Sequence, residues 1–326
     1  MIITLTANPS IDVTLDVPTF EIDEVNRAVS KIKDPAGKGI NVSRALSKNG
    51  VKTAAVFPAD EVNGRWLESS LNALGIDTVT SPIAEEIRTN VTIVDDAGHT
   101  TKVNEAGPRL SDAEHAHLLA QVDSVLAGKP AWLVVGGSLP RGIDSSIYVE
   151  LAERAHANGV RVAIDTSGSA LRDVVAAGVA DLMKPNHEEL EEIAGRALPT
   201  VGDVVDYARS ILRNADAAVL ISLGSHGALL VTDHDSIWAG HAAVSVDSTV
   251  GAGDSSLAGF LSADLSAEIN HLDSGDARRL KVATAVAWGS AAVQLPGTTV
   301  PGPNDITIDK VTTLESPNPN TRIEEL

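Results

Sequence analysis

A short run late in the chain combines two glycines with an acid, in the order Gly251-Ala252-Gly253-Asp254. Apolar residues recur behind it at helical spacing, which predicts that a helix opens at the run. The first N–H groups of a helix lack partners within it, and its dipole places partial positive charge there. Because glycines let a ligand approach the backbone, the run predicts an anion site, above all for phosphate, beside Asp254. This combination indicates a phosphoryl-transfer enzyme, although many glycine-rich turns merely pack tightly.

A second glycine-rich loop lies near the start of the chain. A Walker A loop would end in Gly-Lys-Ser/Thr, but Gly39 follows Lys38. A dinucleotide-binding fingerprint would need a third glycine near position 42, which is Val42. With both of these phosphate-loop motifs excluded, the loop still offers three features to a ligand. Gly37 and Gly39 let it come close to the backbone, Lys38 supplies a positive charge, and Asn41 supplies a side-chain amide. These groups favour a polyol or sugar; the alternative is a glycine-rich helix start with a solvated lysine.

A third motif begins at Lys184, which ends an expected strand, and continues into a helix expected from Asn186. Asn186 is a natural N-cap, and Glu189 stands three residues later, so the pair has the spacing of a capping box. The same two oxygen-bearing side chains suit a hydrated Mg²⁺ near phosphates, because magnesium favours sparse oxygen ligation. Both interpretations remain open.

Other polar residues follow the ends of expected strands. Asp12 comes after the first strand, and open α/β sheets bind ligands at the carboxyl ends of their strands. Ser138 follows another strand and offers a hydroxyl to a ligand. Ser222, Gly224 and Gly227 form a strand end and turn that are suited to flank a nucleotide.

The elements that must position these residues alternate between strand and helix from about residue 41 onward. Helices are expected at 41–49, 63–74, 145–158, 187–194 and 202–214, and strands at 52–58, 131–136, 160–165, 181–184 and 217–223. This alternation predicts a mostly parallel sheet with helices on both faces. A further alternating run at 243–246 predicts a strand that leads directly into the Gly251 turn.

Two regions break this alternation, because each pairs two short strand-like runs without a helix between them. They are residues 13–17 with 25–32, and 89–94 with 100–105; a hairpin turn signal, Asp95-Asp96-Ala97-Gly98, joins the second pair. We interpret them as a small β-sheet lid, formed by 13–34 and 86–108, on a core of 1–12, 35–85 and 109–314. Arg27 and Arg88 lie in this lid. Each is interpreted either as a ligand of an anion or as an ordinary cation on the surface. Residues 315–326 are expected to form a loose tail.

Composition excludes several classes of function. A net charge of −19 argues against a nucleic-acid partner, since that affinity comes from cations that neutralise phosphates. The absence of cysteine excludes thiol nucleophiles, disulfides and cysteine metal sites. No apolar run is long enough for a membrane span, and the first residues read as a strand rather than a signal peptide. We therefore expect a cytoplasmic enzyme.

Taken in order, these motifs resemble the signatures of the ribokinase/PfkB family of sugar kinases, over roughly Ile2 to Pro303. Two signatures carry the likeness: Gly-Lys-Gly-Ile-Asn near the start and Thr-Val-Gly-Ala-Gly-Asp near the end. Three details are typical of members that act on fructose 1-phosphate or tagatose 6-phosphate. They are Thr-Ala-Asn-Pro-Ser-Ile-Asp, Ala-Gly-Lys-Gly-Ile-Asn-Val and Leu-Pro-Gly-Thr-Thr-Val-Pro.

The resemblance implies a large ribokinase-like α/β domain, a lid that closes over the sugar, and ATP with Mg²⁺. It implies a catalytic group made of the base Asp254 and the anion hole Gly251, Ala252 and Gly253. It implies sugar-hydroxyl ligands at Asp12, Gly37, Gly39 and Asn41, and ligands of the substrate phosphate at Lys38, Arg27, Arg88 and Ser138. It implies a nucleotide group of Lys184, Asn186, Glu189, Ser222, Gly224 and Gly227, with Asn186 and Glu189 holding Mg²⁺ through water.

The reaction expected from this resemblance is transfer of the γ-phosphoryl group of ATP to the 6-hydroxyl of fructose 1-phosphate. A kinase for tagatose 6-phosphate or fructose 6-phosphate would use the same residues with the substrate phosphate at the other end of the sugar. A non-catalytic sugar-phosphate-binding regulator is a further alternative, which the retained Asp254 disfavours. The lid strands have exposed edges that can pair with the lid of a second subunit, so a homodimer through the lid is one alternative for the assembly.

Overall fold

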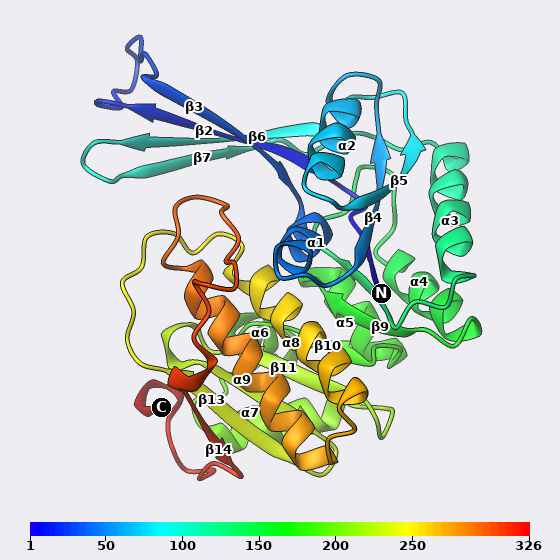
Figure 1. The fold of residues 1–326 in the computed structure, drawn as a ribbon, viewed down its shortest axis with the longest axis vertical. Coiled ribbons are helices and arrows are strands. Elements are labelled where there is room, and N and C mark those ends of the chain that lie inside the picture. The colour runs from blue at the N-terminus through cyan, green and yellow to red at the C-terminus, as the bar shows by residue number, and fades with distance from the viewer.

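The computed structural model describes residues 1–326 and shows one large sheet between two layers of helices, with a second, small sheet projecting from it (Figure 1). The large sheet has 10 strands in the order β14-β13-β12-β11-β10-β9-β8-β1-β4-β5. From β5 to β11 neighbouring strands are parallel, whereas β12, β13 and β14 continue the sheet as antiparallel strands. The strands are β1 Ile2–Leu5, β4 Thr53–Ala59, β5 Asp77–Pro82, β8 Trp132–Gly136, β9 Arg161–Asp165, β10 Leu182–Met183, β11 Ala218–Ser222, β12 Ala228–Thr232, β13 Ser236–His241 and β14 Val311–Glu315.

Helices cover both faces of this sheet, so the chain has two hydrophobic cores. Side chains alternate between the faces of a strand, and β1 accordingly sends Ile3 and Leu5 into one core and Ile2 into the other. The first core is built largely with α2 Asn63–Ala73, α3 Asp112–Leu126, α4 Ile147–Ala157, α5 Gly168–Ala177, α6 His187–Ala194 and α7 Val201–Ile211. The second core is built largely with α1 Lys38–Lys48, α8 Ala252–Ile269 and α9 Ser274–Ala292.

The small sheet has the strand order β3-β2-β6-β7 and extends away from the core in Figure 1. Its strands are β2 Ser10–Val17, β3 Ser30–Ala36, β6 Arg88–Asp95 and β7 Thr100–Asn104. The predicted hairpin is confirmed, because β6 and β7 pair antiparallel on either side of the Asp95–Gly98 turn. The predicted fold class, a mostly parallel sheet with helices on both faces and a small additional sheet, is confirmed. The exact limits of the lid, 13–34 and 86–108, stay a prediction.

The strand expected at 243–246 is wrong. β13 ends at His241, where its pairing with Val311 of β14 also ends, so residues 243–246 have no strand beside them. They form an irregular connection, and Val246 is 63% exposed. Helix α8 nevertheless opens at the glycine run as predicted, with Gly251 as its N-cap.

The loose tail expected at 315–326 is also wrong. The backbone N–H groups of Val201 and Gly202, at the start of α7, donate to the carbonyls of Thr321 and Pro319 at 2.9 Å. Ile323 is 7% exposed and belongs to the first core. The Pro- and Asn-rich composition predicted disorder, but buried apolar side chains, Ile323 among them, and paired backbone groups hold the segment in place.

Two short turns of 3₁₀ helix accompany these elements near the end of the chain, η2 Ile308–Lys310 and η3 Ile323–Glu325, and a third, η1 Gly224–His226, follows β11. None of the helices is long and apolar enough to cross a membrane.

Candidate active site

The candidate residues gather at one edge of the large sheet. Asp165 ends β9, Lys184 follows β10 and Ser222 ends β11, and these strands run parallel. The carboxyl ends of parallel strands meet at one edge, where open α/β sheets bind ligands. Helices α1 and α8 begin at the same edge and lie side by side (Figure 1).

The two glycine-rich loops meet through a direct hydrogen bond. Asn41 donates from Nδ2 to Oδ2 of Asp254 at 2.8 Å. Both side chains come from the first turns of their helices, α1 and α8, so the start of one helix fixes the acid at the start of the other. This bond leaves Oδ1 of Asp254 available to a substrate hydroxyl.

A chain of charges runs beside this pair. Asp165 lies between two lysines: Lys38 Nζ is 2.5 Å from its Oδ1, and Lys184 Nζ is 3.0 Å from its Oδ2. Asp165 and Lys184 are almost completely buried. Asp165 offsets only one of these two cations, so the lysines keep positive charge for a phosphoryl group next to the start of α8, where Asp254 also lies.

The surroundings separate the acidities of the two buried carboxyls. Burial, and then the negative charge of Asp165, raise the pKa of Asp254 above its usual value, against the opposing effects of Lys38, Asn41 and Lys184. Burial would also raise the pKa of Asp165, but Lys184 and Lys38 outweigh it and lower that pKa. Burial opposes charge on Lys38, yet Asp165 and Asp254 raise its pKa. Two carboxyls whose pKa values are pushed apart are typical of an acid–base site, with Asp254 as the group that exchanges a proton.

The backbone at the start of α8 is shaped as an anion site. Gly251 has φ +76°, in the left-handed region that favours glycine. A Cβ on Gly253 would lie 3.1 Å from Lys184 Nζ, so the absence of a side chain lets the lysine approach the loop. Ala252 opens the helix between them. The free N–H groups of an 18-residue helix and a buried lysine therefore face the same point.

The glycines of the first loop have a packing role. A Cβ on Gly37, which has φ +121°, would lie 2.5 Å from Cγ2 of Thr6. A Cβ on Gly39 would lie 2.8 Å from the carbonyl oxygen of Leu5. Both glycines therefore let α1 start against the end of β1, which brings Lys38 and Asn41 to the edge of the sheet.

Asp12 lies at the base of the lid within a group of polar side chains. Its Oδ1 accepts hydrogen bonds from Ser10 Oγ and Asn90 Nδ2, each at 2.9 Å. Oδ1 of Asn90 and Oδ1 of Asn41 are buried and have no hydrogen-bond partner. Because buried polar atoms in folded proteins are nearly always paired, these two oxygens are acceptors available to the donors of a ligand.

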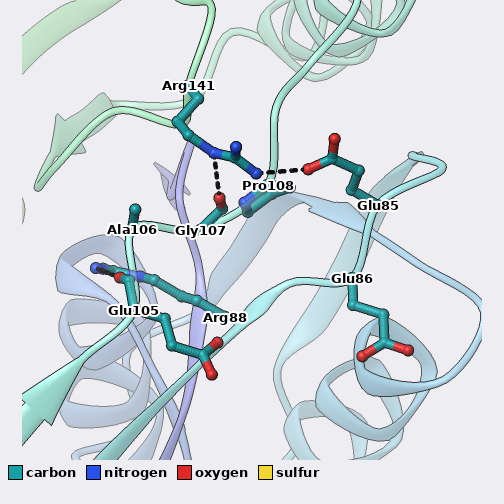
Figure 2. Close-up of a pocket in the computed structure, with 8 residues that line it drawn as sticks. All are labelled: Glu85, Glu86, Arg88, Glu105, Ala106, Gly107, Pro108 and Arg141. Carbon is teal, nitrogen blue, oxygen red and sulfur yellow. Dashed lines mark hydrogen bonds and ion pairs between the residues drawn. The ribbon is translucent and has the colours of Figure 1, made fainter.

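Arg88 lies beside a cavity of about 320 Å³ at the junction of lid and core (Figure 2). Its guanidinium donates to the carbonyl oxygens of Asn8 at 3.2 Å and Glu105 at 3.4 Å, and its Nε is buried without a partner. Across the cavity, Arg141 is held by the Gly107 carbonyl and by the Glu85 carboxylate. Two main-chain carbonyls therefore use only some of the N–H groups of Arg88, and the others remain available to a ligand.

The remaining predicted phosphate ligands differ in place. Ser138 is exposed and its Oγ accepts a hydrogen bond from Asn8 Nδ2 at 3.3 Å, which brings it into the neighbourhood of Arg88. Lys38 lies instead beside Asp254, at the other end of the site. Arg27 lies in the exposed loop between β2 and β3, and its side chain makes no hydrogen bond or ion pair.

The capping box at the start of α6 is confirmed. Asn186 Oδ1 accepts from the Glu189 N–H at 2.7 Å, and Glu189 Oε2 accepts from the Asn186 N–H at 2.8 Å. The second oxygen of Glu189 takes no part in this box, and the carboxylate is close enough to act on the pKa of Lys38. The chain brings no group of three or more His, Asp or Glu side chains together as a metal site. The free oxygen of Glu189 fits a Mg²⁺ that phosphate oxygens and water hold for the most part.

The predicted nucleotide turn follows β11. Ser222 donates its N–H to the Pro185 carbonyl, which joins this turn to the Lys184–Asn186 loop. Gly224, with φ +61°, has open space where a Cβ would lie, whereas a Cβ on Gly227 would overlap the Ala239 carbonyl. Gly224 is therefore free to face a ligand, and Gly227 is required for packing against β13.

Sequence reasoning missed Asp165, Asn90 and Asn8. The signal for Asp165 was present, because it ends an expected buried strand, the same position that singled out Asp12. No sequence pattern marked Asn90 or Asn8 as a site residue. Their roles depend on partners remote in sequence, since Asn90 donates to Asp12 and Asn8 donates to Ser138.

Comparison with known proteins agrees with this geometry. The model of the pfkB family of carbohydrate kinases matches residues 4–305. The chain is 34% identical over 261 residues to the 1-phosphofructokinase of Bacillus subtilis, covering 80% of this chain and 84% of that one. It is 35% identical over 297 residues to the 1-phosphofructokinase of Rhodobacter capsulatus, covering 90% and 92%. A crystal structure of phosphofructokinase-2 from Escherichia coli in complex with fructose-6-phosphate superposes with a TM-score of 0.82 at 31% identity, covering 93% and 96%.

An acid fixed beside a cationic, glycine-rich helix start can take a proton from a hydroxyl while phosphoryl oxygens are stabilised next to it. The site geometry and the match over nearly the whole chain lead to the same result. This chain belongs to the pfkB family of carbohydrate kinases and is a phosphotransferase with an alcohol acceptor.

Proposed function

We propose that this enzyme transfers the γ-phosphoryl group of ATP to the 6-hydroxyl of fructose 1-phosphate, giving fructose 1,6-bisphosphate and ADP. The observation that carries the proposal is the hydrogen bond of 2.8 Å from Asn41 to Asp254. It unites the loop interpreted as a sugar platform with the loop interpreted as an anion site. The relatives named 1-phosphofructokinase support fructose 1-phosphate as the acceptor.

At the transfer end, Asp254 accepts the proton of the 6-hydroxyl through its free Oδ1 as the oxygen attacks the γ-phosphorus. The new O6–P bond forms while the bond from the γ-phosphorus to the bridging oxygen breaks, and ADP leaves with that electron pair. Lys38, Lys184 and the N–H groups of residues 251–253 stabilise charge on the transferring oxygens. Catalysis is therefore mostly positioning and charge stabilisation.

At the acceptor end, polar side chains hold the sugar in place. Asp12, Asn41 and Asn90 receive its hydroxyl groups, and the two unpartnered amide oxygens support this role. Arg88 and Ser138 bind the phosphate that the sugar already carries. Arginine suits this task because its guanidinium donates several hydrogen bonds in fixed directions.

The nucleotide occupies the edge between β10 and β11 in this proposal. Lys184 faces its phosphates, and Ser222 and Gly224 border it. Asn186 and Glu189 hold Mg²⁺ through water, and the ion neutralises charge on the phosphate oxygens when it is bound. An enzyme that consumes ATP is expected in the cytoplasm.

A kinase that acts on fructose 6-phosphate is the second candidate, favoured by the similarity to the E. coli enzyme solved with that sugar. Coupled measurement of ADP release tests both, with fructose 1-phosphate, fructose 6-phosphate and tagatose 6-phosphate as acceptors. The proposal predicts the highest kcat/KM with fructose 1-phosphate. A higher value with either 6-phosphate would overturn it, and sugar-independent ADP release alone would remove the kinase assignment.

The lid also supports a homodimer in this proposal. Four apolar side chains of the β2–β3 region are exposed: Ile22 by 82%, Val25 by 76%, Val29 by 70% and Ile32 by 52%. Apolar patches of this kind mark interaction sites. Light scattering is expected to give a dimer for the wild type and a monomer for Val25→Asp. The matched control Ile269→Asp, at the exposed end of α8, should leave the dimer intact.

A further inference from the structure

Asn8 lies where the chain passes from the core strand β1 into the lid strand β2, and it is 2% exposed. Its Nδ2 donates to the carbonyl oxygen of Ala106 at 3.1 Å, to Ser138 Oγ at 3.3 Å and to the carbonyl oxygen of Leu139 at 3.3 Å. Ala106 belongs to the segment that returns from the lid, and Ser138 and Leu139 follow core strand β8. One buried amide therefore joins the lid return to the core.

The main chain of Asn8 adds a fourth link, because its carbonyl oxygen accepts a hydrogen bond from Nη2 of Arg88 at 3.2 Å. Arg88 is the first residue of β6, where the chain enters the lid a second time. Asn8 thus contacts Ser138 with its side chain and Arg88 with its backbone. These are the two residues proposed above to bind the substrate phosphate.

The orientation of the Asn8 amide is determined by its neighbours. If the amide were turned over, Oδ1 would face the carbonyl oxygens of Ala106 and Leu139, and acceptor would meet acceptor. In the observed orientation Oδ1 is buried, has no hydrogen-bond partner and packs against Gly107. Gly107 has φ +90°, and a Cβ there would overlap this oxygen. The amide is held from both sides and cannot rotate freely.

We propose that Asn8 is a positioning residue for phosphate recognition: it sets the distance between Arg88 and Ser138 across the junction of lid and core. This inference rests on the proposed function. Asn8 does not touch the reacting atoms, which lie near Asp254, and acts on substrate only through the two residues that it holds. Loss of its donors therefore weakens binding of the phosphorylated sugar and leaves the nucleotide end unaffected.

Kinetics of three variants test this role. Asn8→Asp keeps the size of the side chain and removes both donors, Asn8→Ala removes the whole amide, and Asn8→Ser keeps one small donor. Because these variants leave buried acceptors unpaired, KM for fructose 1-phosphate should rise about 10-fold in Asn8→Asp and Asn8→Ala. KM for ATP should change less than about twofold. Asn8→Ser should lie between these variants and the wild type.

The matched control is Thr4→Val. Thr4 lies on β1, the strand that leads to Asn8, and is fully buried. Its hydroxyl shares a hydrogen bond of 2.8 Å with Ser43, away from the phosphate-binding residues. Thr4→Val should lower the melting temperature without changing either KM. A second readout is the preference for fructose 1-phosphate over fructose, measured as a ratio of kcat/KM, which should fall in the Asn8 variants and stay constant in the control.

A double-mutant cycle with Arg88→Ala separates positioning from general packing. If Asn8 acts through Arg88, Asn8→Asp should change KM for fructose 1-phosphate much less in the Arg88→Ala background than in the wild type. Additive effects, an unchanged KM, or equal increases in KM for sugar and ATP would overturn the inference. So would unfolding of all three Asn8 variants, since the role would then be structural. A wild type inactive on every sugar phosphate would instead refute the proposed function.

Discussion

Asn41 and Asp254 are 213 positions apart in the chain, yet a hydrogen bond of 2.8 Å joins their side chains. The bond is possible because α1 and α8 begin at the same edge of the sheet, with the carboxyl end of β9 beside them. It holds Asp254 in a buried place where its pKa is raised by burial and by Asp165. The enzyme thus keeps its base close to two lysines without neutralising it in a direct ion pair.

Asp165 should be the most costly of the site residues to replace. Asp165→Asn leaves Lys184, which is 6% exposed, without its anion. Breaking a buried ion pair by removing one partner typically costs about 3–5 kcal/mol, and we expect a loss of this size in the free energy of unfolding measured with urea. Asp123→Asn is the control, because Asp123 pairs with Arg154 on the surface and should cost less than about 1 kcal/mol. Equal losses in the two variants would contradict the account.

The raised pKa of Asp254 has a consequence for stability at different pH values. A carboxyl whose pKa is higher in the folded state is more easily ionised in the unfolded chain, so its charge lowers stability at neutral pH. This penalty fades as the pH falls through the folded-state pKa towards the usual value near 3.8. Asp254→Asn, which removes the charge, should therefore melt at a higher temperature than the wild type at pH 7. The difference should shrink at acid pH; a lower melting temperature at pH 7 would contradict the raised pKa.

The C-terminal segment should contribute to stability through the buried side chain of Ile323. Ile323 is 7% exposed and packs into the first core, so Ile323→Ala should lower the free energy of unfolding by about 2–5 kcal/mol. Asn320→Ala, at an exposed position of the same segment, should change it by less than about 0.5 kcal/mol. A negligible effect of Ile323→Ala would mean that the segment is not docked in solution.

The parts of the fold that depend on local pattern were predictable from the sequence. Buried parallel strands such as β8, β9 and β11 read as continuous apolar runs, and the structure ends them within a residue of the predicted positions. Helix α6 was marked by its own capping residues, Asn186 and Glu189, and α8 by the glycine run. Local rules suffice here because local and tertiary preferences agree.

The wrong predictions concern residues whose structure depends on contacts with remote parts of the chain. Residues 243–246 alternate as a strand does, but no neighbouring strand offers them hydrogen bonds. Ile323 stands alone among polar residues, so no periodicity marked it as buried. Lys38 was interpreted as a ligand of the substrate phosphate, and only the fold shows that Asp165, 127 positions away, holds it near Asp254. Pairings between remote residues follow from the topology of the sheet, which no short motif encodes.

The central claim is that Asp254 takes the proton of the sugar hydroxyl. Steady-state ADP release with fructose 1-phosphate, measured for the wild type and Asp254→Asn, tests it most directly when calorimetry follows ATP and sugar binding in parallel. Loss of a general base lowers rates by about 10²-fold or more, so we predict at least that fall in kcat with both ligands still bound. Turnover close to that of the wild type in Asp254→Asn would contradict the claim.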